Sequence, residues 1–254
     1  MAAANRLSIE TFDMQHGAQT KTHLAYGSWS TVPIMGYDFL PRTYLCWDNH
    51  SEKAVLEWGA KNKLFKVLVT GNSWVDYWRN KPSTYNENGF ILYTLQPEIL
   101  SLEQSFPIEL VEIIKSLNYK WFVRLHPRQI KQKNEIQEFL KNKGILAQVN
   151  IDGATNTPLP LLLRNCLLHI TNSSTCTIEA SFFQKKTIII NEIGKLYYSE
   201  LISEGKAVYI EMNGDFKKNF EKYIYQIKQI DSTAIVDENT NSSKINTIVT
   251  SLFS

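Results

Sequence analysis

The sequence predicts an α/β protein built on an open, mainly parallel β-sheet with helices on both faces. Three observations support this prediction. From about residue 64, short apolar runs alternate with longer amphipathic segments. The runs are apolar at successive positions, as in strands that helices cover on both sides. Hydrophobic residues make up 43% of the 254 residues and charged residues 20%, which is typical of a globular protein with a well-filled core.

The predicted strands and helices alternate along the chain, as in successive βαβ units. We expect strands at residues 65–70, 90–95, 121–125, 145–149, 167–171, 187–190 and 207–210. We expect helices at residues 99–117, 131–142, 158–165, 175–184, 196–204 and 215–230.

This alternation predicts that residues 64–236 form one Rossmann-like domain. Residues 1–63 hold only about two further βα units, with strands expected at 9–14 and 43–47 and a helix at 51–59. We interpret this segment as the tail of an N-terminal domain whose earlier part lies outside the chain. Residues 237–254 are expected to form a polar loop and, at 246–253, a last helix.

Composition excludes several classes of protein. The 27 basic and 25 acidic residues give a net charge of +2, which predicts no nucleic-acid partner. Three widely spaced cysteines, Cys46, Cys166 and Cys176, indicate neither a disulfide framework nor a zinc site. No apolar stretch reaches the ~18 residues that span a bilayer. We therefore expect a cytoplasmic protein, and the 12 Phe, 12 Tyr and 6 Trp are compatible with peripheral contact with the inner face of a membrane.

Ligands of open α/β sheets bind beyond the carboxyl ends of the strands, so the residues that follow each predicted strand are the site candidates. Gly71 and Asn72 follow the strand at 65–70, where a glycine permits close approach of a phosphate to backbone N–H groups. Gly-Asn is also a common turn. Arg124, His126 and Arg128 lie at the end of the strand at 121–125. Arginine pairs with phosphate oxygens and histidine donates a hydrogen bond or a proton, although His126 is equally able to close a turn by bonding to the backbone.

The polar run Ser173-Ser174-Thr175 follows the strand at 167–171 and precedes a predicted helix. Hydroxyl groups beside the unpaired N–H groups of a helix suit a phosphate, and the alternative is a plain helix cap. Glu179 lies about one helical turn further on, where its carboxylate is placed to accept hydrogen bonds from two ribose hydroxyls.

A fourth candidate group follows the strand expected at 9–14. His16 has the side chain of a general base for an acceptor hydroxyl, and Lys21 is suited to a phosphate or carboxylate on the acceptor side. Neither a Gly-x-Gly-x-x-Gly stretch after a strand nor a P-loop occurs, which argues against a dinucleotide oxidoreductase or a P-loop enzyme. Neither Asp-x-Asp nor His-Glu-x-x-His occurs, so we expect neither a metal nor a bound cofactor.

The ordered set of motifs resembles the GT-B class of bacterial surface-polysaccharide transferases. It consists of His16-Gly17 with Lys21, Gly71-Asn72-Ser73, Arg124 to Arg128 with its His-Pro, and Ser173-Ser174 with Glu179. The similar groups are transferases that use CMP-sugars and the CDP-glycerol glycerophosphotransferases, and the resemblance covers about residues 14–212. The acidic pair before a glycine that CMP-sugar enzymes carry has no match in this sequence.

The resemblance implies transfer of a sugar or glycerol-phosphate, without a metal, from a CMP- or CDP-linked donor to a glycan or lipid-linked acceptor. It implies that His126 and Ser173–Ser174 bind the donor phosphate, that Glu179 binds the ribose and that His16 is the base. Residues 1–63 would then belong to the acceptor side and residues 64–236 would bind the donor. Three alternatives stay open: a nucleotide-sugar 2-epimerase, which needs paired carboxylates that the sequence does not place; an inactive transferase half that acts as a scaffold; and a flavodoxin-like binding module.

Overall fold

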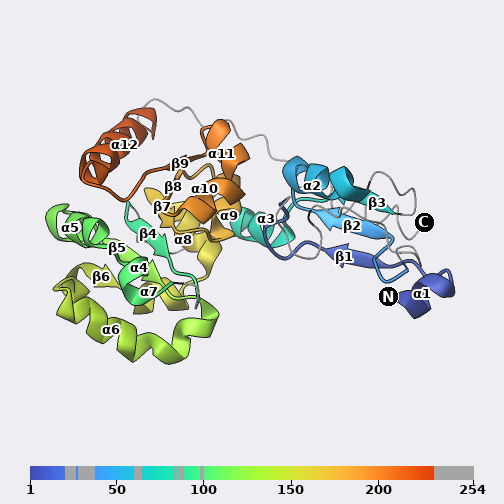
Figure 1. Ribbon diagram of the computed structural model, residues 1–254, viewed down its shortest axis with the longest axis horizontal. Helices are drawn as coiled ribbons and strands as arrows, with labels where there is room; N and C mark the ends of the chain where they lie inside the picture. The colour runs from blue at the N-terminus through green and yellow to red at the C-terminus, as the bar shows by residue number, and fades with distance from the viewer. Residues whose placement is uncertain are drawn as a thin grey trace. The chain divides into compact units, whose positions relative to one another are not determined.

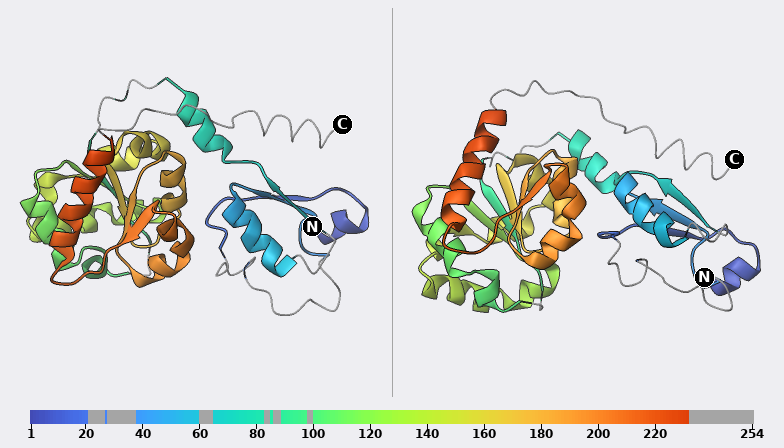
Figure 2. Two further views of the ribbon diagram at one scale, coloured as in Figure 1. Left: turned by 90° about the horizontal axis from the view of Figure 1, so that it is seen from above. Right: turned by 45° about the horizontal axis from the view of Figure 1, so that its top comes forward.

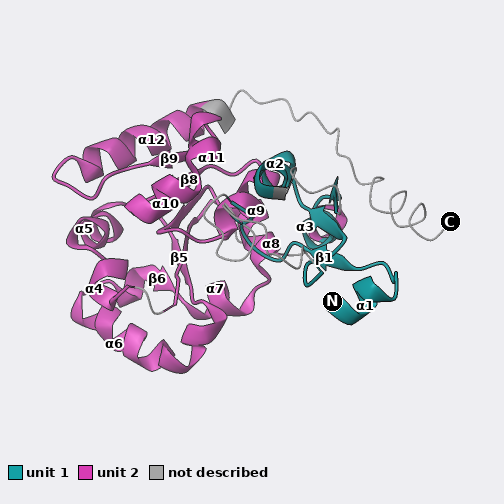
Figure 3. Cartoon of the chain, turned by 45° about the vertical axis from the view of Figure 1, so that its right-hand side comes forward, with its two compact units in different colours: residues 1–77, 238–254 teal, residues 78–237 magenta. Residues whose placement is uncertain are grey.

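The computed structural model describes residues 1–20, 27, 38–59, 65–82, 85, 89–97 and 100–231. Within these residues the chain forms two compact units, unit 1 up to Tyr77 and unit 2 from Trp78 onward (Figures 1 and 3). Lys21 and the predicted loop and helix at 237–254 lie outside the described residues.

Unit 1 holds a small parallel sheet in the order β1-β2-β3. Its elements are α1 (Ala2–Arg6), β1 (Phe12–Met14), β2 (Thr43–Cys46), α2 (Asn49–Gly59) and β3 (Lys66–Val69), followed by α3 (Ser73–Asn80), which runs on into unit 2. The core of unit 1 is aromatic: Tyr44 and Trp58 are buried and pack edge-on, with ring centroids 6.2 Å apart. This core is small because the described residues of unit 1 supply only three strands and one long helix to cover them.

Unit 2 contains a six-stranded sheet in the order β6-β5-β4-β7-β8-β9, in which every neighbouring pair is parallel. The strands are β4 (Ile91–Thr94), β5 (Trp121–Arg124), β6 (Val149–Asn150), β7 (Leu168–Thr171), β8 (Thr187–Ile189) and β9 (Ala207–Tyr209). In chain order this is the 3-2-1-4-5-6 arrangement of a Rossmann-type sheet. The predicted open parallel sheet is therefore confirmed.

Helical segments join these strands. They are α4 (Leu102–Ser105), α5 (Ile108–Ser116), the 3₁₀ turn η1 (Pro127–Gln132), α6 (Lys133–Asn142), η2 (Leu146–Gln148), α7 (Asp152–Asn156), α8 (Leu159–Asn165), α9 (Cys176–Phe182), α10 (Glu192–Tyr197), α11 (Ser199–Ser203) and α12 (Phe216–Asp231). Figure 2 shows α12 lying along the sheet of unit 2.

Both faces of the unit 2 sheet are buried, which explains why the strands read as continuous apolar runs. Ile91 and Tyr93 face the larger core, which α5, α6 and α12 complete. Phe90 and Leu92 face a smaller core that includes side chains of α7, α8 and α9. Alternate residues of one strand thus serve two different cores.

A row of polar side chains continues the smaller core across three strands. The ring of His169 on β7 bonds through Nε2 to Oγ1 of Thr94 (2.9 Å) and through Nδ1 to Oγ1 of Thr187 (3.0 Å). All three residues are buried, and burial lowers the pKa of His169 to about 3. The ring is therefore neutral near pH 7, and each of its nitrogens has one partner.

The structure corrects several sequence-based boundaries. The strand expected at 65–70 was assigned to the donor domain that starts at residue 64, but β3 pairs with β2 and belongs to unit 1. The boundary was misplaced because a parallel strand has the same apolar pattern in either sheet. The helix expected at 99–117 is two helices, α4 and α5, because Pro107 lacks the N–H that would continue the first. The strand expected at 145–149 is mostly the turn η2, and only Val149 and Asn150 pair with β5.

We predict that Thr187→Val destabilises unit 2 by about 1–3 kcal/mol, because it leaves Nδ1 of the buried His169 without a partner. Urea unfolding at pH 7 measures the change. Ser203→Ala, which removes an exposed hydroxyl that bonds only to its own helix turn, should change stability by less than about 0.5 kcal/mol. Equal effects of the two substitutions would contradict the role given to the row.

Candidate functional site

The candidate site lies at the carboxyl ends of β4, β5 and β7 in unit 2. The sheet extends from β4 through β5 to β6 on one side and from β7 through β8 to β9 on the other. The connections that leave β4 and β7 therefore run in opposite directions, which opens a crevice above the strand ends in sheets of this kind. The residues after these strands are the ones that a ligand would meet.

Gln96, two residues beyond the end of β4, bonds to the loop after β7. Its side-chain Oε1 accepts from the backbone N–H of Ser173 at 2.6 Å, and its Nε2 donates to Oγ of Ser173 at 3.0 Å. Sequence reasoning missed Gln96. Its position directly after the strand at 90–95 was the available signal, but a single glutamine carries no recognisable motif.

The loop Asn172–Thr175 is held on several sides. The buried Asn172 donates through Nδ2 to the hydroxyl of Tyr93 (2.9 Å), and the hydroxyl of Tyr198 donates to the carbonyl of Ser173 (3.1 Å). Within the loop, Ser174 donates its backbone N–H to Oγ1 of Thr171 and accepts at Oγ from the N–H of Cys176. Thr175 precedes α9 without a capping bond from its own side chain to that helix. These bonds tie the loop to β4, to Tyr198 and to the start of α9.

Arg124, at the end of β5, bonds to the carboxyl end of helix α7. Its Nη1 donates to the carbonyls of Ala154 and Thr157, each at 2.6 Å, and to that of Thr155 at 3.4 Å. Burial lowers its pKa, and the nearby Cys176 and Glu179 oppose that effect. Arg124 thus caps the carboxyl end of α7 and supplies a positive charge near Glu179.

Glu179, on α9, is the acidic group of the site. Burial raises its pKa to about 7, although Arg124 acts to lower it. The carboxyl group is therefore partly protonated near neutral pH. Cys176 is one turn earlier on α9, and burial followed by the charge of Glu179 raises the pKa of its thiol to about 11, so this cysteine is a neutral thiol.

His126 and Arg128 lie at the start of η1. His126 accepts at Nδ1 from the backbone N–H of Arg128 (3.2 Å), and its own N–H donates to Oε1 of Gln129 (3.1 Å). His126 is half-buried and Arg128 is exposed. The histidine thus closes the turn by a bond to the backbone, which is the structural alternative that the sequence also allowed. Its binding of a donor phosphate stays a prediction.

The remaining predicted residues belong to unit 1. His16 is exposed beyond the end of β1, beside Gln15, whose Oε1 accepts from the N–H of Trp47 at 2.7 Å. Gly71 has φ +77°, which glycine adopts without strain. Asn72 accepts at Oδ1 from the N–H groups of Trp74 and Val75, so it caps α3. In unit 2, Arg124, His126 and Arg128 lie at the end of β5, and Ser173, Ser174, Thr175 and Glu179 lie in the loop and helix after β7. Their ligand contacts stay predictions, as do those of His16, Gly71 and Asn72.

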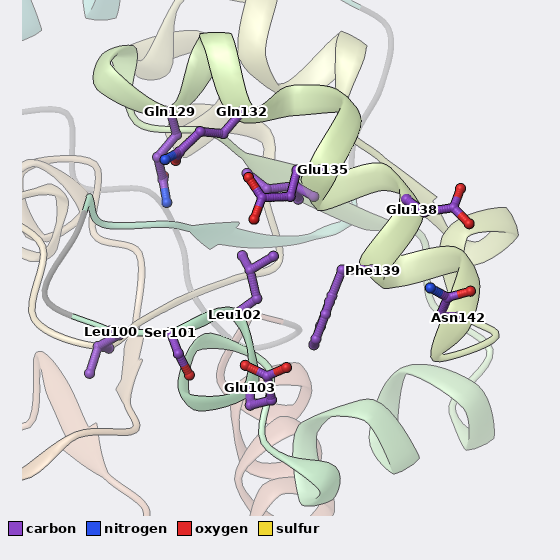
Figure 4. A pocket seen from close by; sticks show the side chains of 11 residues that line it. Leu100, Ser101, Leu102, Glu103, Gln129, Gln132, Glu135, Glu138, Phe139 and Asn142 are labelled. Carbon is purple, nitrogen blue, oxygen red and sulfur yellow. The ribbon is translucent and has the colours of Figure 1, made fainter.

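A separate hollow of about 620 Å³ lies between α4 and the η1–α6 segment, lined by residues such as Leu102, Gln129, Glu135 and Phe139 (Figure 4). Among the described residues, neither a metal-binding group of three or more His, Cys, Asp or Glu residues nor a helix long and apolar enough to cross a membrane is present.

Comparisons with known proteins place the fold. A comparison with protein-family models found no match, and a comparison with curated proteins found none either. The crystal structure of UDP-GlcNAc 2-epimerase from Neisseria meningitidis bound to UDP-GlcNAc is similar with a TM-score of 0.67 and 16% identity, over 99% of this chain and 71% of that one. A putative UDP-N-acetylglucosamine 2-epimerase from Listeria monocytogenes gives 0.64 and 13%, over 98% and 68%. Arabidopsis thaliana UGT89C1 complexed with UDP gives 0.50 and 10%, over 98% and 68%.

At sequence identities this low, the structural similarity shows the fold alone. The chain has an α/β fold of the GT-B type, as its Rossmann-like sheet in unit 2 and the similar structures agree.

We predict that Gly194→Ala disturbs the loop after β7. A Cβ at Gly194 on α10 would lie 2.1 Å from the carbonyl oxygen of Asn172 and 2.7 Å from Cγ2 of Ile189. Relieving this overlap should cost about 1–3 kcal/mol or more of unfolding free energy. Chemical denaturation measures it. Gly214→Ala is the matched control, because a Cβ there meets nothing within 4 Å. A Gly194→Ala protein as stable as the control would show that α10 does not press on the loop.

We also predict that Glu179→Gln stabilises the protein at pH 8 and has little effect near pH 4.5. The pKa of Glu179 is about 7 in the folded chain, against 4.5 ordinarily. The folded state therefore holds a proton that the unfolded state releases, and wild-type stability falls as pH rises from 4.5 to 7. With allowance for partial solvent screening, the gain at pH 8 should be about 1–3 kcal/mol.

Thermal unfolding between pH 4.5 and pH 8 checks this, with Glu112→Gln on the exposed face of α5 as the control. A constant difference between wild type and Glu179→Gln across that range would contradict a raised pKa.

Proposed function

We propose that this chain is a sugar-nucleotide enzyme whose unit 2 binds the nucleotide of the donor at the carboxyl edge of its sheet. One observation carries the proposal. The β4–β7 switch point has two serine hydroxyls, a carboxyl group and an arginine beside it, from Ser173, Ser174, Glu179 and Arg124. That is the place where sheets of this order bind nucleotides. Two of the similar structures are complexes, one with UDP-GlcNAc and one with UDP, which supports the same class of ligand here.

The site residues of unit 2 suit different parts of a nucleotide. The hydroxyls of the Ser173–Ser174 loop and the exposed guanidinium of Arg128 suit phosphate oxygens. The carboxyl group of Glu179 suits paired ribose hydroxyls, since two oxygens can accept two hydrogen bonds. No metal is required in this scheme, because hydrogen-bond donors and cationic side chains stabilise the departing phosphate.

The reaction that the motif order favours is transfer to a growing surface polysaccharide. An acceptor hydroxyl oxygen forms a bond to the anomeric carbon of the donor sugar while the bond from that carbon to the nucleotide phosphate breaks. The acceptor proton passes to a base, for which the motif order favours His16, and the nucleotide leaves with the electron pair. For a glycerol-phosphate donor, the acceptor oxygen attacks phosphorus instead and the nucleoside monophosphate leaves.

A second candidate is epimerisation at C2 of a sugar nucleotide. The structures of UDP-GlcNAc 2-epimerases, which match almost the whole of this chain, favour it. Among the described residues of the switch-point site, Glu179 is the single carboxyl group, whereas an epimerase needs an acid and a base on opposite sides of the sugar carbon. Transfer therefore remains the first proposal.

The first test is a thermal-shift series with UDP, UMP, CDP, CMP and GDP. A ligand that binds only the folded state raises the melting temperature by several degrees at about 100 times its Kd. We expect one base to be preferred and the shift to be lost in Ser174→Ala and reduced in His126→Ala. The absence of any shift would count against an enzyme and favour a scaffold. A shift unaltered in both variants would count against the proposed site, because the nucleotide would then bind elsewhere.

A second test separates the two reactions. Incubated with UDP-GlcNAc and no acceptor, an epimerase forms a stereoisomer of the donor with the nucleotide still attached, which NMR detects. A transferase leaves the donor unchanged until an acceptor glycan is added, and then releases free nucleotide. Removal of one donor to the departing phosphate, as in Ser174→Ala, should lower kcat by about 10²–10³-fold.

A further inference from the structure

The two serines of the loop after β7 differ in how much of their hydrogen-bonding capacity the protein already uses. Ser173 is engaged at every polar group. Its N–H and its hydroxyl both bond to the amide of Gln96, and its carbonyl accepts from Tyr198. A planar side-chain amide that matches one N–H and one hydroxyl in this way fixes both of them at once.

Ser174 has weaker partners. Its Oγ accepts from the N–H of Cys176 at 3.3 Å, and its side chain also hydrogen-bonds to the Cys176 thiol, which acts to lower the pKa of that thiol. The side chain is half-buried, so it is accessible from the edge of the sheet. Because sulfur is a weak acceptor, an incoming phosphate oxygen would take the hydroxyl proton of Ser174 from the thiol.

Gln96 is itself held in place from the β5 side. Gln129, which is 5% exposed, donates from Nε2 to the carbonyl of Gln96 at 3.0 Å and accepts at Oε1 from the N–H of His126. The side chain of one buried glutamine thus joins the strand-end segments after β4 and β5. Through Gln96 the connection continues to the loop after β7, so three strand ends share one continuous set of bonds.

We infer that Gln96 is a positioning residue that occupies Ser173, so that Ser174 is the serine whose hydroxyl donates to the nucleotide phosphate. The role of Ser174 rests on the proposed function, whereas the role of Gln96 in ordering the loop does not. Each half is therefore tested separately.

Amide hydrogen exchange tests the positioning half in the absence of any ligand. In Gln96→Leu, the N–H of Ser173 loses its partner and should exchange at least about tenfold faster, in line with the loss of one hydrogen bond. Gln96→Glu should keep that N–H protected, because a carboxylate oxygen still accepts from it. Gln148→Leu, on the exposed turn η2, is the matched control. Unchanged exchange of Ser173 in Gln96→Leu would overturn the positioning role.

Calorimetric titration with UDP, or with whichever nucleotide the thermal-shift series selects, tests the serine assignment. We expect Ser174→Ala to weaken binding on the order of tenfold and Ser173→Ala by less than about threefold. Gln96→Leu should weaken binding through the loop, so the double variant Gln96→Leu/Ser174→Ala should bind little worse than Ser174→Ala.

Equal losses of nucleotide affinity in Ser173→Ala and Ser174→Ala would show that Ser173 contacts the ligand directly. Strict additivity of Gln96→Leu with Ser174→Ala would show the same of Gln96. Either result would overturn the assignment. Absence of nucleotide binding by the wild type would contradict the proposed function and the role of Ser174 together, while hydrogen exchange still decides the role of Gln96. Circular dichroism of each variant excludes loss of fold as the cause.

Discussion

The parallel pairing of β4 with β7 is the interaction on which the rest of unit 2 depends. It joins strands that lie 77 residues apart in register, from Ile91 opposite Leu168 to Thr94 opposite Thr171. Because both faces of these strands are buried in the two cores, the polar groups that a ligand could meet lie beyond the strand ends. The same pairing brings Gln96 beside Ser173 and places Thr94 within reach of His169.

Much of this arrangement could be predicted from the sequence. Short apolar runs that alternate with longer amphipathic segments indicate buried strands between helices, so β4, β5 and β7 were expected close to their observed positions, as were α6 and α8. The strand-end rule also selected Arg124, Ser173 and Ser174, which lie at the carboxyl ends of β5 and β7, and their contact with a ligand stays a prediction. What periodicity could not decide was which sheet a strand joins. The strand β3 has the composition of its counterparts in unit 2, and its pairing with β2 depends on contacts far apart in the chain.

The roles of individual polar residues were harder to predict, for a physical reason. A residue such as His126 or Asn72 can bond either to a ligand or to the nearest backbone N–H, and both uses need the same atoms in the same kind of turn. Sequence shows the atoms but not the partner. Gln96 illustrates the converse, because its importance comes from geometry: it meets Ser173 only after β4 and β7 have paired. The sequence likewise did not indicate that His169 is a neutral, hydrogen-bonded residue, because its two threonine partners lie on neighbouring strands.

The strand order has a consequence for how the protein acquires its site. β4 to β6 form one half of the sheet and β7 to β9 the other, and each half is assembled from neighbouring parts of the chain. Contacts between distant parts of a chain form late, because they must offset the loss of conformational entropy on closing a long loop. The β4–β7 seam is such a contact, and the candidate site lies at its carboxyl end. A newly made chain would therefore complete its two halves before any ligand could be recognised, so a small molecule can select the finished sheet but cannot guide the early steps of its folding.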